Sequence, residues 1–330
     1  MKTAIVILNY NGEGVLETFL PEVLKHSPEH TVYIIDNNSK DQSLAFIKQN
    51  YPDLPLIELK QNKGYAGGYN EGLKQIDADI YALVNSDIAT SPNWINPILE
   101  EFKNSSNTGI IQPKIRSYRQ PEYFEYAGAS GGFLDKYGYA YCRGRIFDHL
   151  EKDKGQYDDP IDINWASGAC LFIRKEIFDE LGGFDSDYFA HFEEIDLCWR
   201  ARNKGHEIKV IPASVVYHLG GGTLDASSPF KTYLNYRNSL YTLLKNLPQS
   251  KLFSILFSRM VLDGVSGMHL LLQAKPKHFL QVLKAHFSFY KNLRKIYLKR
   301  ESPQNQNYFQ VRSIVWNYFI GKKNTYLKNR

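Results

Sequence analysis

The densest group of chemically active side chains in this sequence is the segment 191–200, which reads His-Phe-Glu-Glu-Ile-Asp-Leu-Cys-Trp-Arg. Three carboxylates, Glu193, Glu194 and Asp196, fall within four consecutive positions between aromatic residues. A carboxylate held among apolar groups loses solvation, so its pKa rises until it can accept a proton from a substrate hydroxyl. Acidic residues are also favoured at a helix N-terminus, where they offset the helix dipole. Taken alone, the segment supports a catalytic cluster and an acidic helix start equally well.

Two further polar segments follow apolar runs near the N-terminus. The segment 36–39, Asp-Asn-Asn-Ser, carries a carboxylate and two amides that can bind a nucleobase and a ribose, although the same residues commonly form a turn. The segment 62–70, Asn-Lys-Gly-Tyr-Ala-Gly-Gly-Tyr-Asn, is a glycine-rich loop that enters a helix. Its glycines permit close approach of a ligand, and a helix N-terminus favours phosphate. A simple connector is the alternative for this loop.

Two candidate metal ligands follow later apolar runs. Asp87 ends the segment 85–87, Asn-Ser-Asp, where a carboxylate can hold Mg²⁺ or Mn²⁺ together with phosphate oxygens. His218 stands before three glycines, and imidazole is an acceptable ligand for Mn²⁺. A turn at Asp87 and a structural histidine at 218 are the simpler interpretations of each position by itself.

The elements that must position these side chains alternate between strand and helix. Apolar runs at 3–9, 31–35, 56–59 and 80–85 alternate with helical patterns at 14–26, 42–49 and 67–75. This order predicts an α/β fold with a mostly parallel central sheet and helices on both faces. Ligands of such sheets bind beyond the carboxyl ends of the strands, where the polar segments stand. Residues 110–157 lose the pattern and are expected to form irregular β structure and loops, before strands at 169–173, 207–211 and 214–217 and helices at 175–181 and 193–203.

Cysteine usage and the N-terminus bear on the compartment. The three cysteines, Cys142, Cys170 and Cys198, lie far apart with no CxxC pair, which argues against a disulfide framework and a structural zinc site. The apolar run at 3–9 is too short for a signal peptide. We therefore expect a cytoplasmic location.

The charge of the chain is strongly asymmetric. Residues 231–330 hold 18 Lys and Arg against two acids, a net charge of +16, whereas the first 230 residues hold 22 basic and 33 acidic residues, a net charge of −11. The apolar run 252–272 is long enough to span a membrane, but three polar residues interrupt it: Arg259, Asp263 and His269. We expect a basic helical region at 229–330 that lies on the anionic inner face of the cell membrane. A helical domain that packs on the core has nearly equal support, and no nucleic-acid module is recognisable.

Together and in this order, the motifs resemble those of the family 2 glycosyltransferases, which have the GT-A fold, and most closely the bacterial rhamnosyltransferase-like branch. The resemblance spans residues 1–225 and is carried by the segments 7–11, 36–39, 64–70, 85–87 and 165–202. It implies a catalytic domain at 1–228, with a nucleotide-sugar-binding half at 1–110 and an acceptor-side half at 111–228.

The resemblance also implies where the donor binds. Asn9 and Asp36 would contact the base, with Asn38 nearby, and Gly67 and Asn70 would flank the sugar diphosphate. The implied donor is a nucleotide-diphosphate sugar.

The metal and catalytic positions follow from the same resemblance. Asp87 matches the last carboxylate of the family's DxD motif, and His218 matches a histidine that completes the metal shell in some members. The cofactor would be a divalent cation, Mn²⁺ or Mg²⁺. Asn85 replaces the first acid of that motif, which lowers the charge available to the metal.

The acceptor side of the implied site centres on Glu194, the general base. Glu193 and Asp196 would shape the site or bind the acceptor, and Trp165 would contact a sugar. The acidic pair departs from the Glu-Asp of many relatives, since Glu194 carries one methylene more, and geometry matters at that scale.

The implied reaction is transfer of a sugar, with inversion, to a hydroxyl of a saccharide or lipid-linked saccharide in the synthesis of bacterial surface polysaccharide or glycolipid. A non-catalytic nucleotide-sugar-binding protein of the same fold is the alternative. A nucleotidyltransferase would show a longer glycine-rich loop with a catalytic Arg and Lys near the N-terminus, and we find none.

Overall fold

The computed structural model describes residues 1–220, 228–302 and 305–329. Four parallel strands form one half of its central sheet, in the order β3-β2-β1-β4. Their bounds are β1 (Thr3–Asn9), β2 (Thr31–Asp36), β3 (Leu56–Glu58) and β4 (Ile80–Asn85). The helices between them are α1 (Glu13–Lys25), α2 (Ser43–Asn50) and α3 (Gly64–Gly72), which continues as the 3₁₀ turn Leu73–Gln75. This half agrees with the strand and helix ranges predicted from the apolar pattern.

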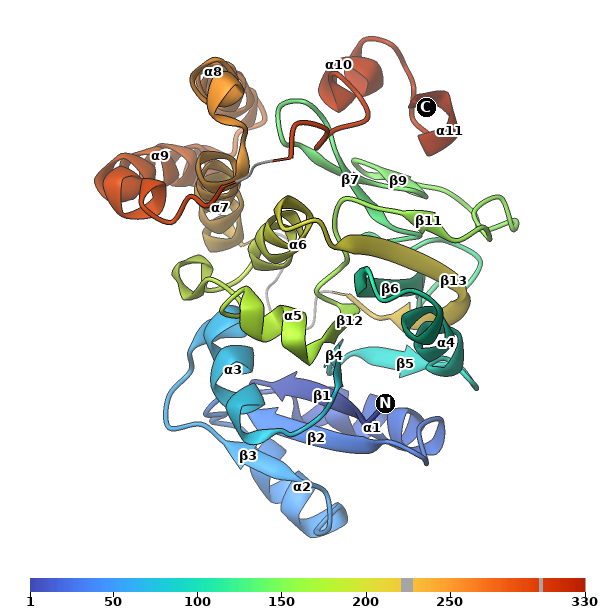
Figure 1. Ribbon diagram of the computed structural model, residues 1–330. Helices are drawn as coiled ribbons and strands as arrows, with labels where there is room; N and C mark the ends of the chain where they lie inside the picture. Colours follow the sequence, from blue (N-terminus) through green and yellow to red (C-terminus); the bar gives the residue numbers. More distant parts are fainter. Residues whose placement is uncertain (221–227, 303–304, 330) are drawn as a thin grey trace.

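The other half of the sheet is mixed (Figure 1). β12 (Cys170–Arg174) runs antiparallel between β4 and β6 (Thr108–Ser117), and β13 (Glu207–His218) is parallel to β6. β5 (Ile88–Thr90) and β11 (Ile161–Asp162) pair antiparallel with β13. The two short strands predicted at 207–211 and 214–217 are one strand with a register shift between Ile211 and Val215. The predicted α/β class is confirmed, with a sheet that is mixed beyond β4.

Helices cover both faces of the sheet, and each face has its own core. Leu16 of α1, Ile47 of α2 and Ile98 of α4 (Asn96–Asn104) belong to the buried cluster on one face. Tyr69 of α3, Ile177 of α5 (Lys175–Glu180) and Leu197 of α6 (Glu193–Asn203) belong to the cluster on the other. Alternate residues of the strands serve the two clusters, as the two-residue period of a β-strand requires.

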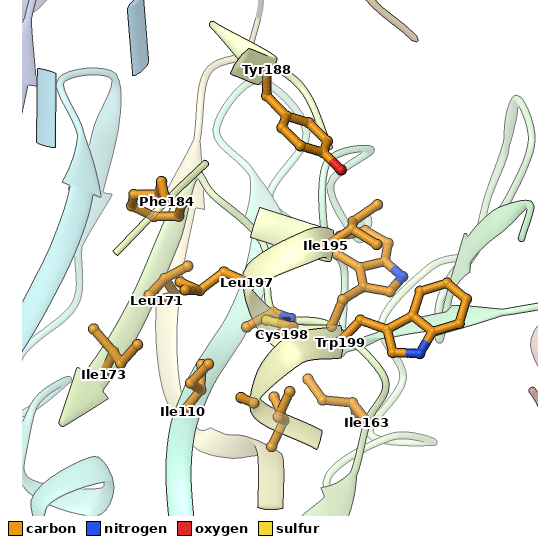
Figure 2. Close-up of a cluster of buried hydrophobic side chains, with 14 of the residues drawn as sticks. Ile110, Ile163, Leu171, Ile173, Phe184, Tyr188, Ile195, Leu197, Cys198 and Trp199 are labelled. Atoms are coloured by element: carbon orange, nitrogen blue, oxygen red, sulfur yellow. Dashed lines mark hydrogen bonds between the residues drawn. The ribbon is translucent and has the colours of Figure 1, made fainter. Parts of the chain in front are cut away.

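Helix α6 is embedded in the second of these cores (Figure 2). Leu197 lies beside Leu171 and Phe184 on one side of the helix, and Ile195 and Trp199 point to the other side. Since the helix is enclosed on both sides, its N-terminus is a rigid mount for the side chains that it carries.

The chain beyond residue 228 packs on this framework (Figure 1). It forms α7 (Pro229–Asn246), α8 (Gln249–Leu272), α9 (Pro276–Tyr297), α10 (Ile314–Phe319) and α11 (Tyr326–Asn329). Helix α7 lies against α6, and α8 and α9 pack on α7. The end of the chain crosses a small antiparallel sheet made of β7 (Gly132–Leu134), β8 (Ala140–Cys142), β9 (Arg145–Ile146) and β10 (His149–Leu150).

Two contacts show how closely the C-terminal region joins the core. The rings of Trp199 on α6 and Tyr308 stack with centroids 4.9 Å apart, and Asn164 donates a hydrogen bond of 3.1 Å to the Tyr308 carbonyl. In charge composition the chain divides near residue 230, whereas these buried contacts cross that division.

Candidate active site

The carboxyl ends of β1, β2 and β4 bring three predicted site residues to one edge of the sheet. The parallel register pairs Asn9 with Asp36 and Leu8 with Asn85. Polar side chains from three separate loops therefore meet beyond the strand ends, where α/β sheets bind ligands.

The Asn9 and Asp36 side chains are buried and bonded to each other. Asn9 Nδ2 donates to Asp36 Oδ1 at 3.0 Å, and Ser39 donates to the same carboxylate through its amide (2.9 Å) and its hydroxyl (2.6 Å). Asn9 Oδ1 is buried and has no hydrogen-bond partner in the described part of the chain. Asn38 takes a left-handed conformation (φ 64°), and its side-chain oxygen accepts from Lys40. The unpartnered Asn9 oxygen leaves this pair one acceptor for a ligand.

The glycine-rich loop is closed by another part of the protein. Gly64 begins α3 with a φ of +68°, and a Cβ there would lie 2.4 Å from the Phe189 carbonyl oxygen. The same oxygen accepts from the amides of Tyr65 (2.7 Å) and Ala66 (3.4 Å). The helix N-terminus that we expected to favour phosphate therefore gives these two amides to a carbonyl, which carries the partial negative charge that a phosphate would have supplied.

The rest of this loop fastens α3 to the segment before α6. A Cβ on Gly67 would lie 2.8 Å from Lys63 Cβ, and one on Gly68 would lie 2.8 Å from Leu8 Cδ1, so both glycines allow close packing. Asn70 donates to the Phe184 carbonyl at 2.7 Å and accepts from the Phe184 amide at 2.9 Å. Both polar atoms of Asn70 are thus used within the protein.

Asp87 and His218 lie side by side, and a residue that the sequence did not single out completes the group. His218 Nε2 lies 3.1 Å from Asp87 Oδ1, and His218 Nδ1 lies 3.2 Å from Glu125 Oε2. All three side chains are nearly buried. Burial by itself lowers the pKa of His218, but the two carboxylates outweigh it and raise the pKa to about 10. Burial likewise raises the pKa of Asp87, and the imidazole beside it reverses the shift to a net lowering.

This group fits a divalent cation that displaces the proton from His218 Nε2, since only a deprotonated imidazole nitrogen binds a metal. Two ligand atoms bound at about 2.1 Å and at right angles lie about 3 Å apart, which is close to the observed separation of Asp87 Oδ1 and His218 Nε2. A carboxylate on the second imidazole nitrogen, here Glu125, is the usual support of a metal-binding histidine. Within the described ranges no three His, Cys, Asp or Glu side chains converge on one point. Phosphate oxygens or water would have to complete such a shell.

The acidic segment follows a strained turn. Phe189, His191 and Phe192 all have a positive φ, between 66° and 70°, although none is glycine. Such conformations persist only where the surroundings enforce them, and they are frequent at functional sites. α6 starts directly after this turn, so its first residues are Glu193 and Glu194.

Glu193 is buried and Glu194 is half-buried, and each has a buried oxygen without a partner in the part of the chain that the structure describes. Glu193 Oε2, Glu194 Oε2 and His191 Nε2 are all buried atoms without a hydrogen-bond partner among the described residues. Burial raises the pKa of Glu194 to about 7 against the opposing pull of the amides at the helix start. Burial, followed by repulsion from Glu194, raises the pKa of Glu193 well above its ordinary value. Burial lowers the pKa of His191 to about 4, so that its imidazole is neutral near pH 7. Glu194 is therefore poised to take up a proton at neutral pH.

Asp196 has the opposite environment. Its Oδ2 accepts from Arg200 Nε and Lys245 Nζ, both at 2.8 Å, and its Oδ1 accepts from Asn246 (2.9 Å) and Tyr188 (3.2 Å). Burial alone raises the pKa of this carboxyl, but the two cations hold it well below its usual range. Asp196 thus shapes the site through protein contacts, and its oxygens are fully used.

Helix α7 holds the strained turn through its backbone. Asn238 Nδ2 contacts the carbonyl oxygens of Tyr188 (3.0 Å), Ala190 (2.8 Å) and His191 (2.7 Å), and Asn238 itself is completely buried. Three carbonyls of the turn that leads to Glu193 therefore converge on one amide of the C-terminal region.

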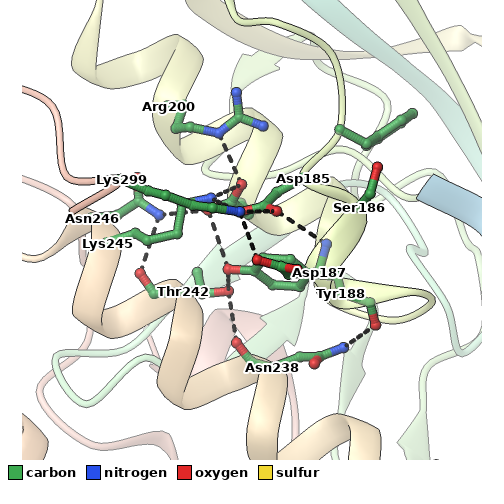
Figure 3. A network of polar contacts seen from close by, with 12 residues as sticks. Asp185, Ser186, Asp187, Tyr188, Arg200, Asn238, Thr242, Lys245, Asn246 and Lys299 are labelled. Carbon is green, nitrogen blue, oxygen red and sulfur yellow. Dashed lines mark hydrogen bonds and ion pairs between the residues drawn. The ribbon is translucent and has the colours of Figure 1, made fainter. Parts of the chain in front are cut away.

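Ion pairs from α7 and from Lys299, just after the end of α9, to the start of this turn extend the network (Figure 3). Lys245 donates to Asp185 at 2.8 Å, and Lys299 donates to Asp185 (2.6 Å) and Asp187 (2.8 Å). In the sequence, Lys245 and Lys299 contributed only to the net positive charge of the C-terminal region, and no local pattern predicted these ion pairs.

Trp165 lies in the core and away from any open surface. Its side chain is packed against Gly132, where a Cβ would come 2.1 Å from the indole, and its Nε1 donates to the Phe133 carbonyl at 3.0 Å. With 3% of its surface exposed, the ring has no face free for the sugar contact that we expected of it.

The chain was compared with known families and curated proteins. Residues 4–182 match the family model described as "Glycosyl transferase family 2". An N-acetylglucosaminyl-diphospho-decaprenol L-rhamnosyltransferase of Mycobacterium tuberculosis is 26% identical over 233 residues, which cover 65% of this chain and 75% of the relative. A hexosyltransferase of low-salt glycan biosynthesis from Haloferax volcanii is 23% identical over 242 residues, or 71% and 73% of the two chains.

Two solved structures share the fold. A mannosyltransferase of Pyrobaculum calidifontis, in complex with GDP-Man and Mn²⁺, superposes with a TM-score of 0.53 at 13% identity, covering 90% of this chain and 83% of that one. GalNAc-T7 with UDP, GalNAc and Mn²⁺ superposes with a TM-score of 0.54 at 17% identity, covering 66% of this chain but 43% of that one. At these identities the likeness shows the fold alone, and it confirms the GT-A expectation.

Proposed function

The chain belongs to glycosyl transferase family 2, and we propose that it transfers a sugar, with inversion, from a nucleotide-diphosphate donor to an acceptor hydroxyl. The observation that carries the proposal is the environment of Glu194. Its side chain is half-buried, one carboxylate oxygen is buried with no partner in the described part of the structure, and burial raises its pKa to about 7. A structural carboxylate would be expected to have partners, as Asp196 has on the same helix.

In this mechanism Glu194 removes the proton of the acceptor hydroxyl as the oxygen attacks the anomeric carbon. Attack comes from the face opposite the leaving diphosphate, which inverts that carbon. General-base catalysis of this type contributes about 10²–10⁴-fold to a rate. Glu193, whose pKa is raised well above its ordinary value by burial and by Glu194, would shape the site or bind the acceptor.

The donor would bind along the edge formed by β1, β2 and β4. Asn9 and Asp36 would contact the base, with Asn38 beside them, while Gly67 and Asn70 would act indirectly by holding α3 in place.

Asp87 and His218 would hold a divalent cation, Mn²⁺ or Mg²⁺, with Asn85 as a weaker neighbour. A bound cation neutralises the charge that develops on a departing diphosphate. Glu125 would keep the His218 ring oriented through its contact with Nδ1.

We further propose that the acceptor is a saccharide carried on a lipid, in the synthesis of a bacterial surface polysaccharide or glycolipid. The name of the mycobacterial relative identifies a diphospho-decaprenol-linked sugar as its acceptor and a rhamnosyl group as what it transfers. The enzyme would then work in the cytoplasm at the inner face of the cell membrane.

Substitution of Glu194 by Gln tests the catalytic assignment. We expect transfer to fall by about 10²–10⁴-fold, because the amide cannot accept the proton. Thermal shift with UDP-, dTDP- and GDP-sugars, with and without Mn²⁺, identifies the donor. The donor should raise the melting temperature of wild type and of Glu194→Gln by the same amount. Glu17→Gln, at an exposed acid of α1, is the control for loss of one charge. Near-normal transfer by Glu194→Gln would refute the assignment. Donor binding without transfer by wild type would favour the non-catalytic alternative.

A further inference from the structure

Helix α8 exposes an uninterrupted apolar stripe. Six side chains at three- and four-residue intervals point away from the protein: Phe253, Phe257, Val261, Val265, Met268 and Leu272. Phe253 and Leu272, at the two ends of the stripe, are 83% and 84% exposed. A contiguous apolar surface of this length marks an interaction site.

The charged residues that interrupt this helix in sequence lie on its other side. Arg259 Nε donates to Asp263 Oδ1 at 2.8 Å, and both side chains are buried. Arg259 also donates to Ser239 on α7 at 3.0 Å. Helix α8 is long and apolar enough to cross a bilayer, and 22% of its most apolar window is buried. Because its inner side carries this buried ion pair and is hydrogen-bonded to α7 through Arg259, a position along the membrane surface fits better than a crossing.

Helix α9 widens the stripe and adds a row of cations. Tyr290 Oη lies 3.2 Å from Met260 Sδ on α8, which places that edge of α9 next to the stripe. On the helix surface next to this edge of α9 lie the exposed side chains of Leu280 and Phe287. Beyond them, farther from α8, lies a row of exposed lysines seven residues apart: Lys277, Lys284 and Lys291.

We propose that this surface, the outer faces of α8 and α9, lies on an anionic lipid bilayer. The apolar stripe would enter the boundary of the acyl chains, and the lysine row would contact the headgroups. Asp263 is the one acid between residues 249 and 299, and it is buried, so the surface offers anionic lipids no repulsion. A second copy of the chain would have to bring a like-charged lysine row close to this one. The role of the bilayer as the source of a lipid-linked acceptor rests on the proposed function.

Co-sedimentation of the full chain with vesicles tests the proposal. We expect binding to phosphatidylcholine vesicles that contain phosphatidylglycerol, and much weaker binding to phosphatidylcholine alone. Each lysine near an anionic surface contributes a factor of roughly five, so Lys277→Gln, Lys284→Gln and Lys291→Gln together should weaken binding about 100-fold. Phe253→Ser with Phe257→Ser should weaken it on both kinds of vesicle.

The matched control removes three exposed lysines elsewhere, Lys322, Lys323 and Lys328 near α10 and α11, and should leave binding nearly unchanged. Equal weakening by this control, equal binding to neutral vesicles, or self-association through the stripe in sedimentation velocity would each overturn the proposal. Glu194→Gln should bind vesicles like wild type. In the wild type, vesicle binding without transfer would refute the proposed function alone, and transfer to a short soluble acceptor without vesicle binding would refute the membrane surface alone.

Discussion

Two carboxylates on the first turn of α6 differ sharply in their surroundings. Glu194 has an oxygen with no partner in the described structure, and burial raises its pKa to about 7. Asp196, two residues later, accepts four hydrogen bonds, and its two cations hold its pKa well below the usual range despite burial. The comparison teaches that partners, together with access to the surface, decide which of two acids on one helix turn is reactive and which is structural.

The contacts around Asp196 also help to hold the turn that carries Glu193 and Glu194. Lys245, one of the two cations on Asp196, also binds Asp185, and Asn238 holds the backbone of the turn before Glu193. Both residues lie on α7, so the basic C-terminal region supplies part of the counter-charge of the catalytic half.

Among the substitutions around Asp196, we expect Lys245→Met to cause the largest loss in the free energy of unfolding. It removes one cation from buried Asp196 and Asp185, and breaking a buried ion pair costs about 3–5 kcal/mol. The free energy of unfolding from urea titration measures the loss. Lys48→Met, which breaks an exposed pair with Glu58, should cost about 1 kcal/mol or less. Equal losses would show that the network does not carry the stability assigned to it.

Asn238→Ala should remove the hydrogen bonds by which α7 holds the turn before Glu193 and Glu194. We expect kcat to fall by about 100-fold, because a base displaced by about 1 Å loses that much, while KM for the donor changes little. Steady-state kinetics separates the two parameters. Asn50→Ala, at an exposed amide that bonds within α2, is the control. A rise in donor KM with unchanged kcat would contradict a role in positioning Glu194.

Glu125→Gln extends the comparison to the metal group. Removing the carboxylate beside His218 Nδ1 should weaken binding of Mn²⁺ by about 10–100-fold, as is usual for the support of a metal ligand. Isothermal titration calorimetry with Mn²⁺ measures this directly, and EDTA-treated wild type should show the matching loss of transfer. Unchanged affinity in the variant would remove Glu125 from the metal group.

The smallest of the expected effects is the dependence of kcat on pH. A base with a pKa of about 7 loses about tenfold in active fraction for each pH unit below that value, so kcat should fall in this way under acidic conditions. Because this pKa is raised in the folded state, the protonated group contributes stability that is lost as pH rises through about 7. Glu194→Gln should lack that loss between pH 5 and 8 in urea titrations. A pH profile that is flat between 5 and 8 would contradict the raised pKa.

Much of the first half of the fold could be predicted because its signals are local. The strands 3–9 and 80–85 have the predicted bounds, since continuous apolar runs are typical of strands buried on both faces. β6 was not recognised as a regular strand, because Gln112, Pro113 and Lys114 interrupt its pattern. Gln112 is tolerated there because its amide donates to Gly128 and accepts from Ser167. Partners so far along the chain leave no local signal.

The sequence by itself determined the residue types at the strand ends, their order along the chain, and the crowding of three acids at the start of α6. Tertiary structure alone decided that Glu125 supports His218, that Phe189 closes the glycine-rich loop, that Trp165 is buried, and that Lys245 neutralises Asp196. The physical reason is that the pKa and the exposure of a side chain depend on its neighbours in space. For Asp196 and Lys245 those neighbours are 49 residues apart in the chain.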